Sequence, residues 1–371
     1  MGEVDLFLGM ISGTSRDGVD AALVSFNDDQ PRMHGSLCLP YPPDLADKLK
    51  SMIETRQRPA TPDMLEMDEL LAAVFAEAAL ALLEQAGIAA SSVTAIGSHG
   101  QTVWHQPAGP EPETIQLGHP GKIARHTGIV TVGDFRQADM KAGGQGAPLA
   151  PLLHRALLRP VEGTRVVLNL GGIANISVIA SDGSVLGFDT GPANCLLDAW
   201  IMDQSGEPFD RDGAWSAAGA VDQVLLLEML ADPYFKKPPP KSTGIEYFNS
   251  GWIQRQELVN SIEPRDVQAT LAQLTASTAA SAIAPHQPAD VLVCGGGAYN
   301  QDLMRRLDIL LPECSVESTA SHGLQPDSVE AILFAWLARE RIAGRRQDTG
   351  PITGANAAIL LGDVFSPDPL T

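Results

Sequence analysis

Several features that would define a protein class are scarce in this sequence. Four cysteines, Cys38, Cys195, Cys294 and Cys314, are spread over 371 residues, and none forms a Cys-x-x-Cys pair. This spacing argues against a zinc site or a disulfide framework and favours a reducing compartment. Basic residues are also few: 25 Lys and Arg stand against 45 Asp and Glu, giving a formal net charge of -20. Because nucleic-acid and anionic-membrane binders need basic patches, neither kind of partner is expected.

Long apolar runs are missing as well. No stretch approaches the roughly 20 apolar residues that span a bilayer, and the N-terminus has no basic segment followed by an apolar run. We therefore expect a cytoplasmic protein. Hydrophobic residues at 44% and charged residues at 19% are ordinary for a globular chain. A length of 371 residues favours two domains.

The common nucleotide and catalytic motifs are absent too. Lys241-Ser242-Thr243 resembles the end of a Walker A loop but lacks its glycines and its strand, so a polar turn is predicted. The run at 144–149 fails the dinucleotide fingerprint at its third glycine. Neither His-Glu-x-x-His nor the landmarks of protein kinases occur. Any ATP site must therefore use a different phosphate loop.

Two stretches, however, repeat one pattern of strand, small polar turn and returning strand. The first covers residues 6–24 and the second residues 166–179. Glycines in such turns leave backbone N–H groups open to a ligand, and successive N–H groups form a concavity suited to an anion. Two such hairpins in two halves of one chain predict an enzyme that handles a polyphosphate.

Strands and helices alternate along the rest of the chain. Helices are predicted at 64–86, ending at Gly87, and at 149–158, 195–204 and about 327–343. Strands at 93–96 and 128–132 are predicted to end in the polar clusters 97–101 and 133–136, where ligand groups gather in open α/β sheets. A hairpin–helix–strand–helix–strand order occurs twice, which indicates two related α/β lobes. We expect one lobe over 1–130 and the other over 131–371, and the sequence leaves open whether the C-terminal segment packs on the first lobe.

The paired hairpins and a later strand–Gly-Gly-Gly loop resemble the acetate and sugar kinase/Hsp70/actin superfamily. Further blocks occur in order over the whole length and are similar to those of the anhydro-N-acetylmuramic acid kinase family. These blocks lie at 9–20, 97–102, 134–136, 142–149, 187–192, 209–215, 240–244, 294–298 and 330–337. Two positions depart from the family pattern, Arg16 for leucine and Ala193 for glycine.

The resemblance implies a two-lobed actin-like ATPase (RNase H-like) α/β fold, in which each lobe is a mixed sheet with flanking helices and the active site lies in the inter-lobe cleft. It implies a homodimer that uses ATP and Mg²⁺ in peptidoglycan recycling. The reaction implied is hydrolytic opening of the 1,6-anhydro ring of anhydro-N-acetylmuramic acid with phosphorylation of O6, giving N-acetylmuramic acid 6-phosphate and ADP.

Asp189 is the expected general base for water, because it follows a predicted buried strand; helix capping is the alternative role. Arg136 is expected to bind the sugar's carboxylate or the γ-phosphate, against the alternative of a surface ion pair. Asp17 is expected to hold Mg²⁺ through water, or else to bond its own turn. Further sugar-binding residues are expected at Glu330, Asp134, His99 and Gln101, the last two with an inter-lobe structural hydrogen bond as the alternative. ATP contacts are expected from Ser12, Gly13, Thr14, Ser15, Arg16, Asp17, Gly18, Val19, Gly171, Gly172, Asn175, Gly295, Gly296, Gly297 and Asn300.

Two other functions remain open at this point. Another small-molecule kinase of the superfamily would use the same base on a substrate hydroxyl instead of water. A nucleotide-switched binding protein would resemble the chaperone and actin members, although the sequence has no long separate peptide-binding domain. Release of a reducing sugar end together with ADP distinguishes the first alternative, and sugar-stimulated ATP turnover excludes the second.

Overall fold

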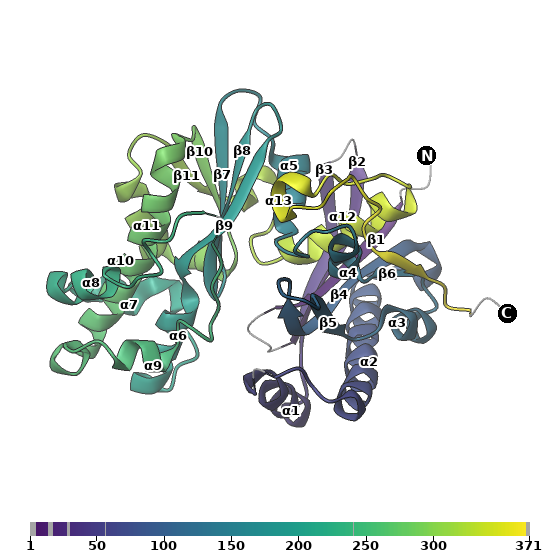
Figure 1. Cartoon of the computed structure of the whole chain (residues 1–371), viewed down its shortest axis with the longest axis horizontal. Coiled ribbons are helices and arrows are strands. Elements are labelled where there is room, and N and C mark those ends of the chain that lie inside the picture. The colour runs from purple at the N-terminus through teal and green to yellow at the C-terminus, as the bar shows by residue number, and fades with distance from the viewer. Residues whose placement is uncertain (1–4, 14–17, 28–29, 56, 240, 369–371) are drawn as a thin grey trace. The chain divides into compact units, whose positions relative to one another are not determined.

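A computed structural model describes residues 5–13, 18–27, 30–55, 57–239 and 241–368. The chain divides into two compact units (Figure 1): unit 1 comprises 1–157 and 328–371, and unit 2 comprises 158–327. This division differs from the expected boundary at residue 130. Unit 1 retains β6 (Thr131–Gly133) because it pairs with β4 (Val93–Gln106), and it gains β12 (Asp363–Phe365) because that strand pairs with β6.

Unit 1 is built on a mixed sheet with the strand order β12-β6-β4-β1-β2-β3. The hairpin of β1 (Leu6–Ser12) and β2 (Gly18–Asn27) continues antiparallel into β3 (Gln30–Pro40), whereas β1, β4 and β6 run parallel. β5 (Glu113–Leu117) pairs with the end of β4. The polar residues 97–101 lie inside β4 and not beyond its end, because the strand continues into its pairing with β5.

Helices of unit 1 cover both faces of this sheet. α12 (Val329–Ile342) lies directly on β1 and β4: a Cβ at Gly9 would be 1.8 Å from the Ala331 carbonyl oxygen, and one at Gly97 would be 1.9 Å from that of Phe334. On the other face, Leu8 and Met10 join the core formed with α2 (Thr61–Ala86), as the period of two in a strand requires. α2 begins one turn earlier than predicted and ends at Gly87, which adopts the left-handed conformation. The remaining helices are α1 (Pro43–Glu54), α3 (Pro120–Thr127), α4 (Phe135–Lys141), α5 (Ala150–Leu158) and α13 (Gly350–Thr353), with a 3-10 turn at Ala90–Ser92.

Unit 2 repeats this topology in a sheet of order β11-β10-β7-β8-β9. β7 (Thr164–Leu170), β8 (Ile173–Ala180) and β9 (Val185–Pro192) form an antiparallel meander, and β10 (Asp290–Cys294) and β11 (Ser315–Ser318) run parallel to β7. Three antiparallel strands followed by two parallel ones, with the first strand in the middle, is the arrangement that unit 1 also has. The predicted two-lobed α/β fold with a mixed sheet in each lobe is confirmed.

The core of unit 2 forms mainly between this sheet and α10 (Pro264–Ile283), most of whose residues are buried. The other helices are α6 (Asn194–Ser205), α7 (Ala214–Ala218), α8 (Gln223–Leu230), α9 (Ser250–Gln254) and α11 (Gln301–Leu310). Short 3-10 turns occur at Arg211–Gly213, Val259–Ser261, Ala284–His286, Gly296–Tyr299 and Thr319–His322. In the described part of the chain, no helix has the length and apolar character needed to cross a membrane.

Candidate functional site

The first hairpin is held firmly at both ends of its turn. Ser12 Oγ, at the end of β1, donates a hydrogen bond of 2.6 Å to Gln101 Oε1 on β4. Gly18 opens β2 against the backbone of β3, where a Cβ would be 2.4 Å from the Leu39 carbonyl oxygen. Val19 is fully buried in the core that α2 also forms, and a contact between Val19 and ATP remains a prediction. The turn residues Thr14, Ser15, Arg16 and Asp17 lie outside the described residues, and Gly13 immediately precedes them.

Gln101 uses both ends of its amide within unit 1. Its Oε1 accepts from Ser12, and its Nε2 donates to the Thr102 carbonyl at 3.1 Å. The side chain is almost completely buried. Gln101 therefore joins the end of β1 in the first hairpin to the parallel strand β4. This hydrogen bond lies within unit 1 and is not the inter-lobe hydrogen bond that was the alternative for Gln101.

Arg136 is oriented by His99 in unit 1. Arg136 Nε donates to His99 Nε2 at 2.8 Å, and His99 Nδ1 lies 2.9 Å from the Gly100 carbonyl. Because a carbonyl only accepts, the ring proton belongs on Nδ1, which leaves Nε2 as the acceptor for the arginine. Burial and the neighbouring arginine hold the pKa of His99 well below its usual value, so the ring is neutral. The two terminal nitrogens of the guanidinium have no hydrogen-bond partner among the described residues and are available for an anion.

Glu330 lies in the first turn of α12, near the charge of Arg136. Burial lowers the pKa of Arg136 to about 10, and the Glu330 carboxylate acts in the opposite direction. Glu330 is exposed to solvent on one side. Desolvation by the protein around it nevertheless raises the pKa of its carboxyl, and the negative charge of Asp20 on β2 raises this pKa further. The close packing of α12 on Gly9 and Gly97 fixes where this helix begins relative to the sheet. Glu330, Arg136 and His99 thus form one cluster in unit 1.

Asp134 belongs to different surroundings. It follows β6 in the left-handed conformation, with φ of 58°, which is uncommon for a residue with a side chain. Burial raises the pKa of its carboxyl, and the charged groups acting on it are His119, Asp363, Lys141 and Asp68. None of these belongs to the cluster of Arg136. A role for Asp134 in sugar binding remains a prediction.

The second hairpin, in unit 2, is joined to the start of α6. The Gly172 carbonyl accepts from the backbone N–H groups of Ala193 at 3.0 Å and Cys195 at 3.1 Å, and the Gly171 carbonyl accepts from Asn194 at 3.0 Å. These bonds satisfy donors that a helix N-terminus otherwise leaves unpaired. The carbonyls of the turn are therefore committed to α6. Ala193, which stands where the family pattern has glycine, has a negative φ of -122° and so does not need the conformational freedom of glycine in φ.

The Gly-Gly-Gly loop packs against the same hairpin. Gly295 has φ of 78°, and a Cβ there would lie 2.4 Å from Asn169 Oδ1; a Cβ at Gly297 would lie 2.5 Å from Leu170 Cβ. At Gly296 the nearest atom would be 3.7 Å away, so this position has room. Asn300 caps α11, its Oδ1 accepting from Leu303 N at 3.0 Å. Two of the three glycines are thus required by packing, and the expected ATP loops of unit 2 lie together.

Asp189 lies inside β9, four residues before the cap of α6, so helix capping is not its role. It stands opposite Asn175 of the second hairpin, while Gly191 pairs with Ala174, which leaves Thr190 as an extra residue in a β-bulge. Bulges redirect side chains and are common beside active sites. Burial raises the pKa of Asp189 to about 6, against the opposing effect of a hydrogen bond from Thr243 N to Oδ2 at 2.9 Å. A carboxylate with such a pKa is suited to accept a proton near neutral pH.

Sequence reasoning missed the groups that surround Asp189. Lys241, Thr243 and Tyr234 contact its backbone or its carboxylate from a segment about fifty residues away. It also missed the charge of Asp20 beside Glu330. Within the described ranges, no three His, Cys, Asp or Glu side chains are grouped closely enough to hold a metal ion by themselves.

Comparisons with known proteins agree on one family. Residues 5–367 match the family model described as anhydro-N-acetylmuramic acid kinase. The anhydro-N-acetylmuramic acid kinase of Xanthomonas campestris pv. campestris is 48% identical over 97% of both chains, and that of Vibrio cholerae is 45% identical over 99% of this chain and all of the relative. Among solved structures, component A of (R)-2-hydroxyglutaryl-CoA dehydratase from Acidaminococcus fermentans aligns over 90% of this chain and 98% of that chain, with 13% identity and a TM-score of 0.47, too distant a likeness to bear on function. On the match over nearly its whole length, the chain belongs to the anhydro-N-acetylmuramic acid kinase family.

Proposed function

We propose that this ATP-dependent kinase opens the 1,6-anhydro ring of anhydro-N-acetylmuramic acid with water and transfers the γ-phosphoryl group of ATP to O6. The products are N-acetylmuramic acid 6-phosphate and ADP, as murein recycling requires. One observation carries the ring-opening step: Asp189 is a partly buried carboxylate with a pKa near 6, on a bulged strand directly opposite the phosphate hairpin. The family membership supports the choice of substrate.

Asp189 acts as the general base. Only Oδ2 of its carboxylate is hydrogen-bonded within the described residues, to the N–H of Thr243, so Oδ1 remains to accept a proton. A water molecule gives this proton to Asp189 as its oxygen attacks C1, and the bonding pair of C1–O6 passes to O6. O6 then bonds to the γ-phosphorus, whose bond to the bridging oxygen of ADP breaks. Because phosphate captures the departing oxygen, no second carboxylic acid is needed, and the attack from the opposite face inverts C1.

Arg136 and Glu330 bind the sugar in this proposal. The free terminal nitrogens of Arg136 form a fork that matches a carboxylate, and the lactyl group of the sugar supplies one. His99 positions this fork by accepting from Nε. Glu330 accepts hydrogen bonds from sugar hydroxyls, and its raised pKa reflects a carboxylate that lacks enough donors without a ligand.

The two hairpins and the Gly-Gly-Gly loop bind ATP. N–H donors in such turns stabilise the charge on the transferring group, and positioning supplies most of the rate in phosphoryl transfer. Asp17 would hold Mg²⁺ through water, and the ion would supply neutralisation of the charge on the phosphates.

Product analysis tests this function directly. The protein is incubated with anhydro-N-acetylmuramic acid, ATP and Mg²⁺, and the sugar products are examined by mass spectrometry and NMR. We expect one reducing end and one 6-phosphate for each ADP released, with inverted configuration at C1 in the first product formed. A phosphorylated sugar that keeps its anhydro ring would indicate another sugar kinase, and ADP without a modified sugar would indicate a nucleotide-switched protein.

The location of the protein in the cell and its oligomeric state are part of the same proposal. A cytoplasmic location fits the use of ATP and the four cysteines, none of which forms a disulfide in the described structure. A homodimer is proposed on the family membership, and light scattering on the purified chain tests it.

A further inference from the structure

Three hydrogen bonds hold Asp189 at the edge of the unit 2 sheet, two through its backbone and one through its carboxylate. β9 is the last strand of that sheet, so one side of it lacks a neighbouring strand. The Lys241 carbonyl accepts from Asp189 N at 3.1 Å, and Thr243 N donates to Asp189 Oδ2 at 2.9 Å. Tyr234 Oη donates to the Asp189 carbonyl at 2.8 Å. The segment 241–243, called the strap below, thus contacts the edge strand at the proposed base.

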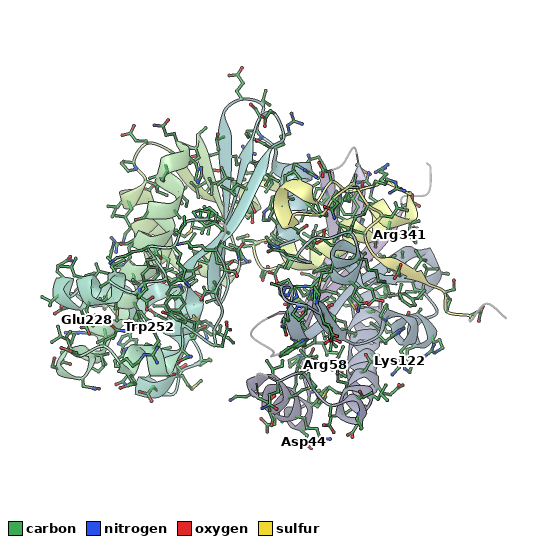
Figure 2. The ribbon with its side chains drawn as sticks, viewed as in Figure 1. Asp44, Arg58, Lys122, Glu228, Trp252 and Arg341 are labelled. Atoms are coloured by element: carbon green, nitrogen blue, oxygen red, sulfur yellow. The ribbon has the colours of Figure 1, made fainter. Side chains whose placement is uncertain are left out.

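The excursion that carries the strap is fastened at both ends to Asp232. At the beginning, Tyr234 N donates to Asp232 Oδ1 at 2.8 Å. At the far end, Tyr247 Oη donates to Oδ1 at 2.9 Å and Trp252 Nε1 to Oδ2 at 2.8 Å. Figure 2 labels Trp252 among the helices of unit 2. Since the tether joins the two ends of the excursion, it limits how far the strap can move from β9.

Lysine side chains lie over the ring of Tyr234. Lys241 Nζ is 4.8 Å from the ring centroid and Lys237 Nζ is 5.6 Å from it, both within cation–π range. The ring itself is buried. Lys241 therefore makes two links to the base, one through its own carbonyl and one through the tyrosine that bonds the carbonyl of Asp189.

We propose that the strap and Tyr234 are positioning residues for Asp189: they fix its backbone, occupy Oδ2 and leave Oδ1 for the reacting water, and they hold the Lys241 ammonium over the Tyr234 ring beside this site. This inference rests on the proposed role of Asp189 as the base. It gives a function to the Lys-Ser-Thr segment, which by sequence is only a polar turn.

The charges around Asp189 act in both directions. Burial is the largest effect on the pKa of Asp189, and the negative charge of Glu246 adds to it, whereas the Thr243 N–H and Lys241 lower the pKa; together these effects give a pKa of about 6. Asp189 acts on Lys241 in turn: burial and Lys237 lower the pKa of the Lys241 ammonium, and the negative charge of Asp189 raises it. Asp189 in turn raises the pKa of the Tyr234 phenol. The strap thus supplies both groups that oppose the cost of burying the carboxylate.

The first test changes the charge of the strap. Lys241→Met removes the ammonium, and we expect the acid limb of the pH profile of kcat to move up from near pH 6 by about half a pH unit. Lys241→Arg keeps the charge and should restore the wild-type limb. Lys237→Met is the matched control: it removes a lysine over the same ring that does not act on Asp189, so the limb should stay in place.

The second test removes the N–H donor. Thr243→Pro removes the backbone N–H and should move the acid limb of the kcat profile to higher pH. Thr243→Ala keeps this donor and should leave the limb where it is in the wild type. Tyr234→Phe should lower kcat about 10-fold with the KM for ATP and the acid limb unchanged, because its hydroxyl bonds the carbonyl and not the carboxylate.

A direct titration separates this proposal from the proposed function. The pKa of Asp189 is measured by NMR of carboxyl-¹³C-labelled aspartate, with its signal assigned by its loss in Asp189→Asn. We expect a higher pKa in Lys241→Met than in the wild type and in Lys237→Met. Equal values in all three proteins would overturn the role of the strap. If the wild type opens no anhydro ring, the proposed function fails, while the titration still reports on the strap.

Discussion

The two units share a strand order but use different strands for their chemistry. In unit 1 the third strand, β3, alternates between exposed and half-buried residues along its whole length, and the candidate groups lie in β4, after β6 and at the start of α12. In unit 2 the third strand, β9, carries Asp189 and is covered at that residue by the strap. A repeated scaffold thus does not repeat the site, because function depends on the side chains placed on it.

The hairpins differ in a similar way. Around the first, Ser12 and Gln101 join neighbouring strands through side chains. In the second, the carbonyls of Gly171 and Gly172 join the turn to a helix. The contacts described for the first hairpin are thus made by the ends of its strands, and those described for the second are made by the carbonyls of its turn.

The largest expected effect is the loss of kcat when the proposed base in unit 2 is replaced, and it is larger than the effect of replacing a sugar-binding group of unit 1. Asp189→Asn removes the proton acceptor and should lower kcat about 10²–10⁴-fold, for both ring opening and phosphorylation. ATP affinity, measured by calorimetry, should change little. Persistent turnover in this variant would remove Asp189 as the base.

Packing provides the next comparison. Gly97→Ala places a Cβ 1.9 Å from the Phe334 carbonyl oxygen and should lower the free energy of unfolding by about 3 kcal/mol or more, because α12 must move away from the sheet. Gly296→Ala is the matched control in unit 2, where a Cβ has room, and should change stability by less than about 0.5 kcal/mol. Thermal unfolding of both variants checks this, and equal losses would contradict the packing of α12.

Arg136 tests the cluster of unit 1. Arg136→Lys keeps the charge but loses the fork, so we expect the KM for the sugar to rise about 10–100-fold with the KM for ATP nearly unchanged. Arg125→Lys, at an exposed position on α3, is the control and should leave both constants as they are. A larger effect on ATP than on the sugar would assign Arg136 to the γ-phosphate instead.

The smallest effect concerns stability and pH. Because the pKa of Asp189 is raised from 3.8 to about 6 in the folded state, the native protein binds a proton there more tightly than the unfolded chain does. Its ionisation therefore destabilises the fold as pH rises through this window. Asp189→Asn should be more stable than the wild type by about 1–2 kcal/mol at pH near 8, with the difference disappearing near pH 4. Denaturant unfolding at both pH values measures it, and a constant difference would mean that the carboxyl is not perturbed.

The repeated architecture can be predicted from the sequence because each of its elements produces a pattern within a short stretch of residues. Alternating strands, the helix ending at Gly87 and the two hairpins are all visible within short windows. The sequence predicts that a strand ends in the polar cluster at 97–101, whereas pairing with β5, a distant segment, extends β4 through this cluster. Asp189 was identified as a site residue, but its place inside a bulged strand depends on pairing with β8. Block 240–244, which contains the strap, is visible as part of the family resemblance, but its contact with Asp189 is not, since no local pattern relates Lys241 to a residue more than fifty positions earlier.

The destination of water oxygen tests the central claim, that Asp189 directs water to C1 while O6 takes the phosphoryl group. The wild-type protein is incubated with anhydro-N-acetylmuramic acid, ATP and Mg²⁺ in H₂¹⁸O, and the sugar phosphate is analysed at once by mass spectrometry and by the isotope shifts in its ¹³C and ³¹P spectra. We predict one ¹⁸O on C1 and none on phosphorus. Label on the phosphate, or an unlabelled C1 in the first product formed, would contradict the account.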